Sequence, residues 1–190
     1  MDRIAMHDLS KKYWVGICPH PNLVDYVDVL KLELKEKIGW YHSVNSKAHI
    51  TFFEFINRGE KLVAIEKYLM EFCSSLSAFE IRLDKVSPYQ KAFCLFPDEY
   101  SKDILIPVMK QFQKGKPFRP DGKSVDPHMS IARLLTPEQM NEAIKLFSNR
   151  AFDTKFIFDN LTIRKFKPEI GQYEIYKRFE FGKRADSLLF

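Results

Sequence analysis

Hydrophobic and polar positions along this chain follow two alternating periods. Apolar residues recur at intervals of three and four from Leu23 to Ile38, which predicts an amphipathic helix that ends at Gly39. Shorter runs rich in β-branched and aromatic residues, bounded by proline or glycine, predict strands. The predicted strands are residues 13–18, 47–56, 79–86, 91–96, 128–135, 155–166 and 173–181, and the predicted helices are residues 21–38, 59–76, 98–113 and a segment that Thr136 opens.

The same order of elements occurs twice. Pro19 and Pro97 each end the first strand of a half and lie 78 residues apart, while His49 and His128 lie 79 residues apart in the second strands. Such an internal offset indicates a duplicated β-α-β-α-β unit. We therefore expect residues 1–190 to form a single bilobal domain, with lobes contributed roughly by residues 12–88 and 89–181 that share a cleft.

Composition places the chain among ordinary globular proteins. Of its 190 residues, 45% are apolar and 29% are charged, a balance that excludes intrinsic disorder and collagen-like or coiled-coil repeats. The chain has only 7 glycines and lacks a P-loop, a Rossmann fingerprint, a G-x-S-x-G elbow and an H-E-x-x-H motif. These absences argue against the common nucleotide-binding, serine-hydrolase and zinc-protease mechanisms.

Cysteine usage and the N-terminal sequence bear on the compartment. Cys18, Cys73 and Cys94 are widely spaced and form no metal-ligand pattern, which is typical of buried thiols in a reducing environment. The N-terminal residues lack the apolar core and cleavage site of a signal peptide. No apolar run approaches the length of a membrane span. We therefore expect a cytoplasmic protein without a membrane segment.

The chemistry of the chain is concentrated in two short motifs. The sequences HITF, at residues 49–52, and HMSI, at residues 128–131, each place a hydroxyl residue two positions after a histidine. Because side chains alternate between the faces of a strand, each histidine shares a face with its hydroxyl residue. The apolar residues between them belong against helices, so the histidine faces are left to line the cleft.

Two imidazoles and two hydroxyls suit the cleavage of a phosphodiester. One imidazole can take a proton from the attacking oxygen while the other gives a proton to the leaving oxygen. The hydroxyls of Thr51 and Ser130 can donate hydrogen bonds to the non-bridging phosphate oxygens as negative charge develops there. Such a site requires no metal ion and no cofactor.

These paired motifs resemble those of the 2H phosphoesterase superfamily, and in particular of the 2′-5′ RNA ligase-like proteins, also called RNA 2′,3′-cyclic phosphodiesterases. The resemblance extends from Tyr13 to Phe181, since the motif spacing and the duplicated order both match. It implies an α+β fold with two antiparallel sheets that face a central cleft and helices outside. It also implies that His49 and His128 are the catalytic acid/base pair and that Thr51 and Ser130 bind phosphate.

Candidate substrate-binding residues surround the second motif. Arg133 lies where RNA-processing members of the family often carry an arginine, although simple alternation places it on the face opposite His128 unless a bulge re-aims it. The loop of residues 114–127 belongs to a region, residues 110–133, with six basic and two acidic side chains. In this loop Arg119 and Lys123 are candidates for phosphate contacts and Phe118 for stacking on a base. A plain surface loop is the alternative interpretation.

The predicted function is a metal-independent phosphoesterase that hydrolyses or reversibly ligates 2′,3′-cyclic phosphate or 2′-5′ phosphodiester bonds. Its substrate would be an RNA end or a small cyclic nucleotide, and we expect a monomer without an obligate protein partner. One alternative is an RNA- or nucleotide-binding protein without turnover. Another is a cyclic phosphodiesterase for a small nucleotide such as ADP-ribose cyclic phosphate. The motifs leave open which histidine is the base.

Overall fold

The computed structural model describes residues 11–182, so that the first ten and last eight residues of the predicted domain lie outside the described part. The helices of this part are α2 (Pro21–Ile38), α3 (Lys61–Ser74), α4 (Glu99–Gly115) and α5 (Pro137–Phe147). The strands are β1 (Lys12–Ile17), β2 (Ile50–Ile56), β3 (Phe79–Tyr89), β4 (Ala92–Pro97), β5 (Gly122–Lys123), β6 (Met129–Arg133), β7 (Thr154–Phe158), β8 (Asn160–Lys167) and β9 (Gln172–Glu180). The predicted elements are thus confirmed in order, with differences at their ends, and the short strand β5 is an addition.

Two of the helices begin at residues that the sequence marks as caps. The Asp98 carboxylate accepts a hydrogen bond from the Ser101 amide, 2.7 Å away, at the start of α4. Thr136 opens α5 through a reciprocal capping box with Gln139, and Pro137 occupies the first turn. These caps fix the entry points of the two helices that follow the strands of the second half.

The nine strands form one antiparallel sheet, where the sequence predicts two. Their order is β7-β3-β4-β6-β2-β1-β8-β9, and β5 pairs with β2 beside this path. The two groups of strands are joined because β2 and β6 pair at Ile50 and Met129. This pairing links positions 79 residues apart, so the local patterns that predict single strands carry no signal of it. The prediction of an α+β fold is confirmed, and the prediction of two separate sheets is corrected to one curled sheet.

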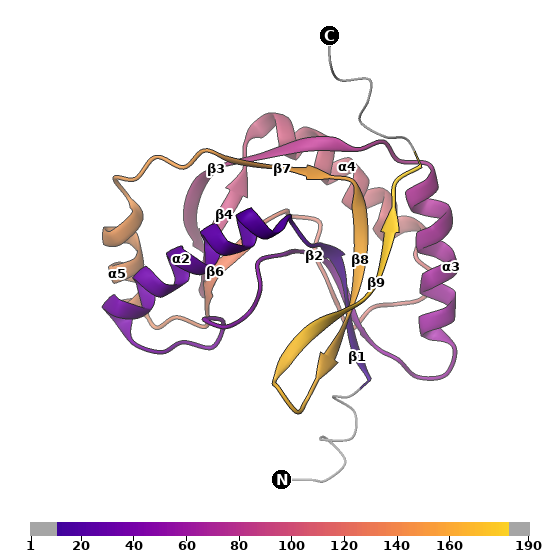
Figure 1. Cartoon of the computed structure of the whole chain (residues 1–190), viewed down its shortest axis with the longest axis horizontal. Helices are drawn as coiled ribbons and strands as arrows, with labels where there is room; N and C mark the ends of the chain where they lie inside the picture. Colours follow the sequence, from indigo (N-terminus) through magenta and orange to yellow (C-terminus); the bar gives the residue numbers. More distant parts are fainter. Residues whose placement is uncertain (1–10, 183–190) are drawn as a thin grey trace.

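Strands from both halves of the chain mix along this sheet. The first-half strand β3 lies between β7 and β4, whereas β8 lies between β1 and β9. The predicted run of residues 155–166 is interrupted at Asp159, and its two parts, β7 and β8, belong to distant positions of the sheet. Figure 1 shows the sheet as an open half-barrel with the β8–β9 hairpin at one side of its opening.

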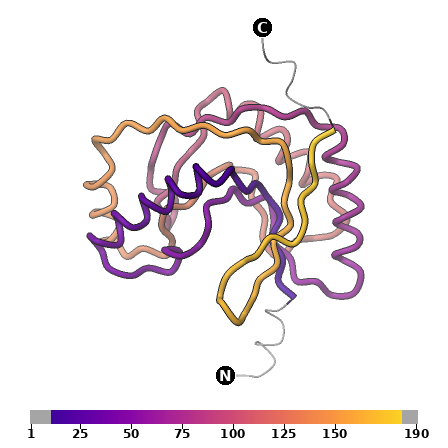
Figure 2. Tube along the Cα trace, viewed as in Figure 1, coloured from indigo at the N-terminus to yellow at the C-terminus, as the bar shows by residue number. Residues whose placement is uncertain are grey.

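The helices cover the sheet in different places. α2 and α5 pack together and contact β6, β7, β3 and β4, while α3 packs along β8 and β9. α4 contributes Phe112, whose ring meets those of Phe52 and Phe53 at centroid distances of 5.3 and 5.4 Å. Figure 2 shows how the chain passes repeatedly between the side of the molecule that holds α2 and α5 and the side that holds α3. The buried phenylalanines hold β2 against α4 and so position the residues on the other face of β2.

Candidate active site

Each motif strand carries one extra residue just after its hydroxyl residue. In the pairing of β1 with β2, Val15 faces Phe53 and Gly16 faces Thr51, so Phe52 has no partner of its own. Phe52 and Phe53 are consecutive and both fully buried. This arrangement is a β-bulge, which shifts the alternation of side chains by one residue.

The second half repeats this irregularity at the matching position. In the pairing of β4 with β6, Phe93 faces Ala132 and Cys94 faces Ser130, and Ile131 is left without a partner. Ile131 and Ala132 are again consecutive and fully buried. The duplicated bulge therefore belongs to the architecture of both motifs.

The bulges re-aim the residue that lies five positions after each histidine. Arg133 and Glu54 would point away from the histidines in regular strands, yet both line the same cavity as His49 and His128. Simple alternation thus gives the wrong face for Arg133, and the bulge at Ile131 is the physical reason. Sequence analysis allows Arg133 to reach the site only if a bulge re-aims it, and the structure contains that bulge.

The two histidines stand at equivalent places and make equivalent hydrogen bonds. Nδ1 of His49 lies 2.6 Å from the Lys47 carbonyl oxygen, and Nδ1 of His128 lies 2.8 Å from the Asp126 carbonyl oxygen. A carbonyl only accepts hydrogen bonds, so Nδ1 is the protonated nitrogen in each ring. Nε2 of each imidazole is therefore the nitrogen available for proton transfer.

One cavity brings both motifs together. It has a volume of about 390 Å³, and both histidines are half-buried in its wall. Its lining includes both hydroxyl residues, the two re-aimed residues and a lysine of β5: Thr51, Ser130, Glu54, Arg133 and Lys123. Lys91 also lines this cavity, so the arrangement offers two proton-transfer groups, two hydroxyl donors and three cations to one small anionic group.

The hydroxyl of Thr51 is held by a residue for which sequence analysis gives no role. The indole Nε1–H of Trp14 donates to Thr51 Oγ1 at 2.9 Å, and Trp14 is buried. Because Thr51 Oγ1 accepts this bond, its own proton can point elsewhere, including into the cavity. The sequence indicates only that Trp14 lies on the first strand beside the site, as a core residue; the bond to Thr51 joins residues 37 positions apart and has no local signal.

The equivalent hydroxyl in the second half has a weaker partner. Cys94 Sγ lies 3.8 Å from Ser130 Oγ and can donate its thiol proton to it. Burial raises the pKa of the Cys94 thiol to about 11, so the thiol stays protonated at neutral pH. Gly16 pairs with Thr51 in the first half, and Cys94 pairs with Ser130 at the equivalent position of the second half. Glycine has no side chain, so only Cys94 can contact its hydroxyl residue from this position.

His49 lies in a setting that disfavours its protonated form. Burial lowers the pKa of His49 from its ordinary value of 6.5 to about 3, and the charges of Arg164, Lys31 and Arg133 act in the same direction. Its ring packs edge-on against the Trp14 indole at a centroid distance of 4.8 Å. His49 is therefore neutral at pH 7, with Nε2 able to accept a proton.

The basic loop contributes only one of its three predicted residues to this cavity. Lys123 lies in β5, which pairs with β2 through Phe53 and Glu54, and its side chain lines the cavity. Phe118 instead packs on Phe53 and Phe55, and exposed Arg119 lines a neighbouring surface depression that Lys123 also lines. The loop is thus docked on the sheet, and Phe118 and Arg119 do not line the cavity that holds the histidines.

Three further observations concern the described residues 11–182. Cys18, Cys73 and Cys94 are free thiols, the latter two buried and Cys18 half-buried. No group of three or more His, Cys, Asp or Glu side chains in this part of the chain is placed to hold a metal ion. Likewise, none of its helices is long and apolar enough to cross a membrane.

Comparison with known proteins decides the family. Residues 19–168 match the sequence profile of the 2′-5′ RNA ligase superfamily. The chain belongs to this superfamily of phosphoesterases. The resemblance that the two histidine motifs indicate is thereby confirmed at the level of the superfamily. No curated protein matches the chain by sequence.

Solved structures of the superfamily's fold are similar over most of the chain. TT0787 of Thermus thermophilus has a TM-score of 0.60 at 13% identity, covering 90% of this chain and 98% of its own. E. coli LigT in complex with 3′-AMP has a TM-score of 0.59 at 14% identity, with the same coverage. Usb1 of Kluyveromyces marxianus has a TM-score of 0.53 at 12% identity, covering 81% of this chain and 93% of its own. At these identities the likeness concerns the fold.

Proposed function

We propose that this protein is a metal-independent phosphoesterase that hydrolyses, or reversibly ligates, 2′,3′-cyclic phosphate or 2′-5′ phosphodiester bonds in RNA or small nucleotides. The observation that carries the proposal is the duplicated constellation in one cavity. Two imidazoles with free Nε2 atoms and two strand hydroxyls line the same 390 Å³ space. Membership of the 2′-5′ RNA ligase superfamily supports this assignment.

The electrostatics favour one direction of proton transfer. His49 is neutral at pH 7, since burial lowers its pKa to about 3, and it therefore acts as the base. A bound phosphate anion beside Nε2 raises this pKa and strengthens the base where it is needed. His128 is then the acid, and it donates its proton from Nε2.

The hydrolytic step follows from these roles. A water oxygen attacks the phosphorus of the cyclic phosphate, and its proton passes to Nε2 of His49. The bond from phosphorus to the leaving ribose oxygen breaks, and that oxygen takes the proton from Nε2 of His128. Thr51 and Ser130 donate hydrogen bonds to the non-bridging oxygens, and Arg133 and Lys123 offset the charge that develops there. In ligation the hydroxyl of a second chain takes the place of water: its oxygen bonds to phosphorus, its proton passes to Nε2 of His49, and the same ribose oxygen leaves with the proton of His128. Cleavage of the resulting phosphodiester bond to a cyclic phosphate is the reverse of this ligation.

The size of the cavity favours a short substrate segment. A space of about 390 Å³ suits one nucleotide phosphate with part of its sugar. E. coli LigT has been solved in complex with 3′-AMP, with ATP and with NADP+, which supports a nucleotide as the bound group here. A small nucleotide such as ADP-ribose cyclic phosphate is the second candidate substrate.

The test is hydrolysis of a 2′,3′-cyclic-phosphate-ended oligonucleotide in the presence of EDTA. We expect turnover by the wild type and its loss in both His49→Ala and His128→Ala. His20→Ala is the matched control, because His20 is exposed at the start of α2 and makes no side-chain capping bond. A single histidine variant with full activity would falsify the mechanism.

The same oligonucleotide substrate distinguishes an enzyme from a protein that only binds RNA. An RNA-binding protein without turnover would show a steep dependence of affinity on salt and no product. Turnover of a short cyclic-phosphate substrate would instead establish the enzyme. The comparison of oligonucleotide with mononucleotide substrates then identifies the preferred length.

A further inference from the structure

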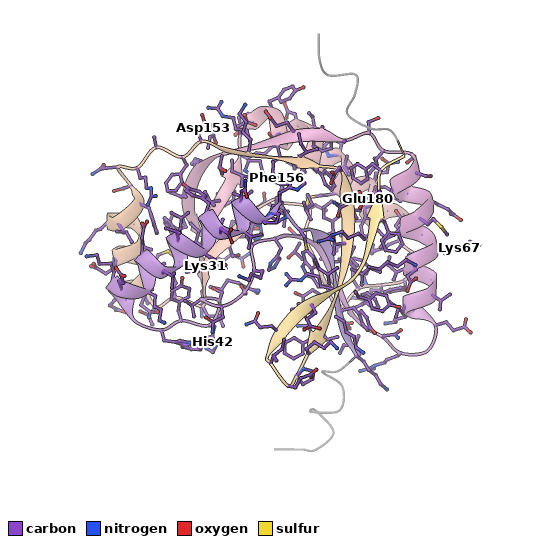
Figure 3. The ribbon with its side chains drawn as sticks, viewed as in Figure 1. Lys31, His42, Lys67, Asp153, Phe156 and Glu180 are labelled. Atoms are coloured by element: carbon purple, nitrogen blue, oxygen red, sulfur yellow. The ribbon has the colours of Figure 1, made fainter. Side chains whose placement is uncertain are left out.

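A second cavity adjoins the candidate active site on the side of His49. Its volume is about 270 Å³, and it shares four lining residues with the first cavity, including His49 and Arg133. Its other lining residues come from β1, β8, β9 and the segment that follows α2: Trp14, His42, Ser43, Ser46, Arg164 and Tyr173. Figure 3 shows His42 in this segment, across the opening from the β8–β9 hairpin.

This cavity collects polar groups that have no partner. Among the described residues, four buried side-chain nitrogen or oxygen atoms lack a hydrogen bond, and three of them belong to lining residues of this cavity. They are Arg164 Nε, Ser43 Oγ and the Tyr173 hydroxyl. Arg164 is 7% exposed and Ser43 is 5% exposed. Leaving such groups unpaired costs free energy, so a ligand that accepts hydrogen bonds is the expected occupant.

Arg164 is also a buried charge without an acid beside it. Its Nη2 donates to the Tyr173 carbonyl oxygen, and its guanidinium lies 5.9 Å from the Trp14 ring centroid. Within residues 11–182 no carboxylate comes within ion-pair distance of Arg164. Packing on an aromatic face and one carbonyl leaves most of the guanidinium charge uncompensated.

The surroundings add positive charge. Lys31 is 1% exposed, and its ammonium donates to the Ser46 carbonyl oxygen. Arg133, at the boundary of the two cavities, has no ion pair in the described part of the chain. Two cations, Arg164 and Arg133, therefore line the space next to His49, and a third, Lys31, is buried against the backbone of the lining residue Ser46.

The nearby acids already have partners. Glu54, which lines both cavities, pairs with Lys12 at 3.1 Å, and Asp28 pairs with Lys47 at 2.6 Å. The ring centroid of Tyr173 lies 5.9 Å from the same Lys12 ammonium. The buried groups that line this cavity and still have a proton to donate are thus the Arg164 Nε–H and the hydroxyls of Ser43 and Tyr173.

We infer that this second cavity binds a further phosphate group of the nucleotide substrate, beyond the phosphate on which the histidines act. The inference rests on the proposed function for the identity of the substrate. A phosphate fits because it accepts several hydrogen bonds and neutralises the cations, and because the two cavities meet at His49 and Arg133. The preferred substrate then carries its scissile cyclic phosphate and a second phosphate on the same nucleotide or on the adjoining linkage.

The experiment compares three substrates that share one cyclic phosphate. They are adenosine 2′,3′-cyclic phosphate, the same nucleotide with a 5′-phosphate, and the dinucleotide whose 5′ oxygen is esterified by an internal phosphodiester. We expect the second phosphate to raise kcat/KM by about tenfold or more, as charge-assisted hydrogen bonds do. A gain confined to the 5′-phosphate assigns the cavity to a terminal phosphate, and a gain shared by the dinucleotide assigns it to an RNA linkage.

Two variants test the residues. Ser43→Ala removes a hydroxyl that has no hydrogen bond in the structure, so no internal bond is lost. We expect Ser43→Ala to lower the ratio of kcat/KM between the phosphorylated and unphosphorylated substrates, and Arg164→Gln to bring that ratio close to one. Ser148→Ala is the control, because Ser148 is an exposed serine at the end of α5, and it should leave the ratio as in the wild type.

Each outcome bears on one proposal or the other. If the wild type hydrolyses all three substrates with equal kcat/KM, the second phosphate site is wrong and the phosphoesterase stands. If it hydrolyses none, the proposed function is wrong, and the cavity is tested directly with inorganic pyrophosphate by tryptophan fluorescence. Saturable binding that Arg164→Gln and Ser43→Ala weaken would then support an anion site, and binding that neither variant changes would overturn it.

Discussion

Ile50 and Met129 face each other where β2 meets β6, and each directly follows one of the two histidines. In an antiparallel pair, this register continued by one residue sets His49 opposite Ser130 and Thr51 opposite His128. Both Ile50 and Met129 are fully buried, so their neighbours face the other side of the sheet, toward the cavity. A single backbone pairing thus relates the two halves of the site by a local twofold axis.

The two hydroxyl residues offer a direct test of phosphate binding. We expect Thr51→Val, which preserves the side-chain shape, and Ser130→Ala each to lower kcat about tenfold to a thousandfold, because a donor to the developing charge is lost. The measurement is steady-state kinetics on a 2′,3′-cyclic phosphate substrate with circular dichroism to confirm folding. Variants that keep wild-type kcat would remove the two hydroxyls from the mechanism.

Trp14 is expected to act through Thr51. Trp14→Phe keeps an aromatic ring beside His49 but removes the N–H that lies 2.9 Å from Thr51 Oγ1. Loss of one neutral hydrogen bond predicts a fall in kcat of about three- to tenfold. Trp40→Phe is the control, since Trp40 is exposed and lies outside the cavity. In the background of Thr51→Val, Trp14→Phe should have little further effect on kcat, and an additive loss would argue against positioning through Thr51.

The protonation of His49 predicts the acidic side of the pH profile. Because the pKa of His49 lies near 3 in the free protein, lowering the pH from 7 to 5 should not reduce kcat/KM through this residue. The profile of kcat/KM between pH 4 and 7 checks this prediction. An acidic limb near pH 6 to 7 in the wild type would contradict this low pKa of His49.

The lowered pKa of His49 also makes the free energy of unfolding depend on pH. The folded-state pKa of His49, about 3, lies below its unfolded value of 6.5, so the unfolded chain binds more protons between these values. This contribution to the free energy of unfolding is complete above pH 6.5 and is lost as the pH falls toward 3. Urea unfolding of the wild type and His49→Gln at pH 7 and pH 4.5 should show a smaller pH dependence in the variant. Equal dependence in the two proteins would contradict the shift.

Gly16 is expected to tolerate no side chain. A Cβ at Gly16 would lie 2.1 Å from the Ile50 carbonyl oxygen and 2.6 Å from the Trp14 ring. Gly16→Ala should therefore destabilise the protein by about 1–3 kcal/mol or more and disturb the pairing of Gly16 with Thr51 beside the bulge. Gly122→Ala is the matched control for stability, because the nearest atom to its Cβ would be 3.9 Å away. Thermal unfolding of both variants measures the difference, and a Gly16→Ala protein as stable as Gly122→Ala would refute the steric argument.

Sequence analysis predicts what depends on local pattern and on duplication. The helix of residues 21–38 follows from apolar spacing alone, and the pairing of His49 with His128 follows from the repeated motif. The bulges also have a sequence signal, since Phe52-Phe53 and Ile131-Ala132 place two apolar residues where alternation would require a polar one. Two adjacent apolar residues indicate a bulge only when the partner strand is known. For this reason simple alternation predicts the wrong face of the strand for Arg133.

The missed features all depend on contacts between distant segments. The single sheet depends on the pairing of Ile50 with Met129, and the role of Trp14 depends on a residue 37 positions away. The second cavity combines Ser43 with Arg164, which belong to opposite halves of the chain. Neither residue has a notable local context, so only the fold brings them together.

The short strand β5 pairs backbone groups of β2 that would otherwise be open to another strand. β6 pairs with β2 only at Ile50, which would leave the rest of that edge of β2 with unsatisfied backbone groups. Gly122 and Lys123 pair with Glu54 and Phe53 there, and the flanking amide of Ser124 donates to the Phe52 carbonyl oxygen at 3.0 Å. Open strand edges are templates for aggregation, and this segment closes one of them. The basic loop therefore covers the stretch of β2 that β6 leaves unpaired while it delivers a lysine to the cavity.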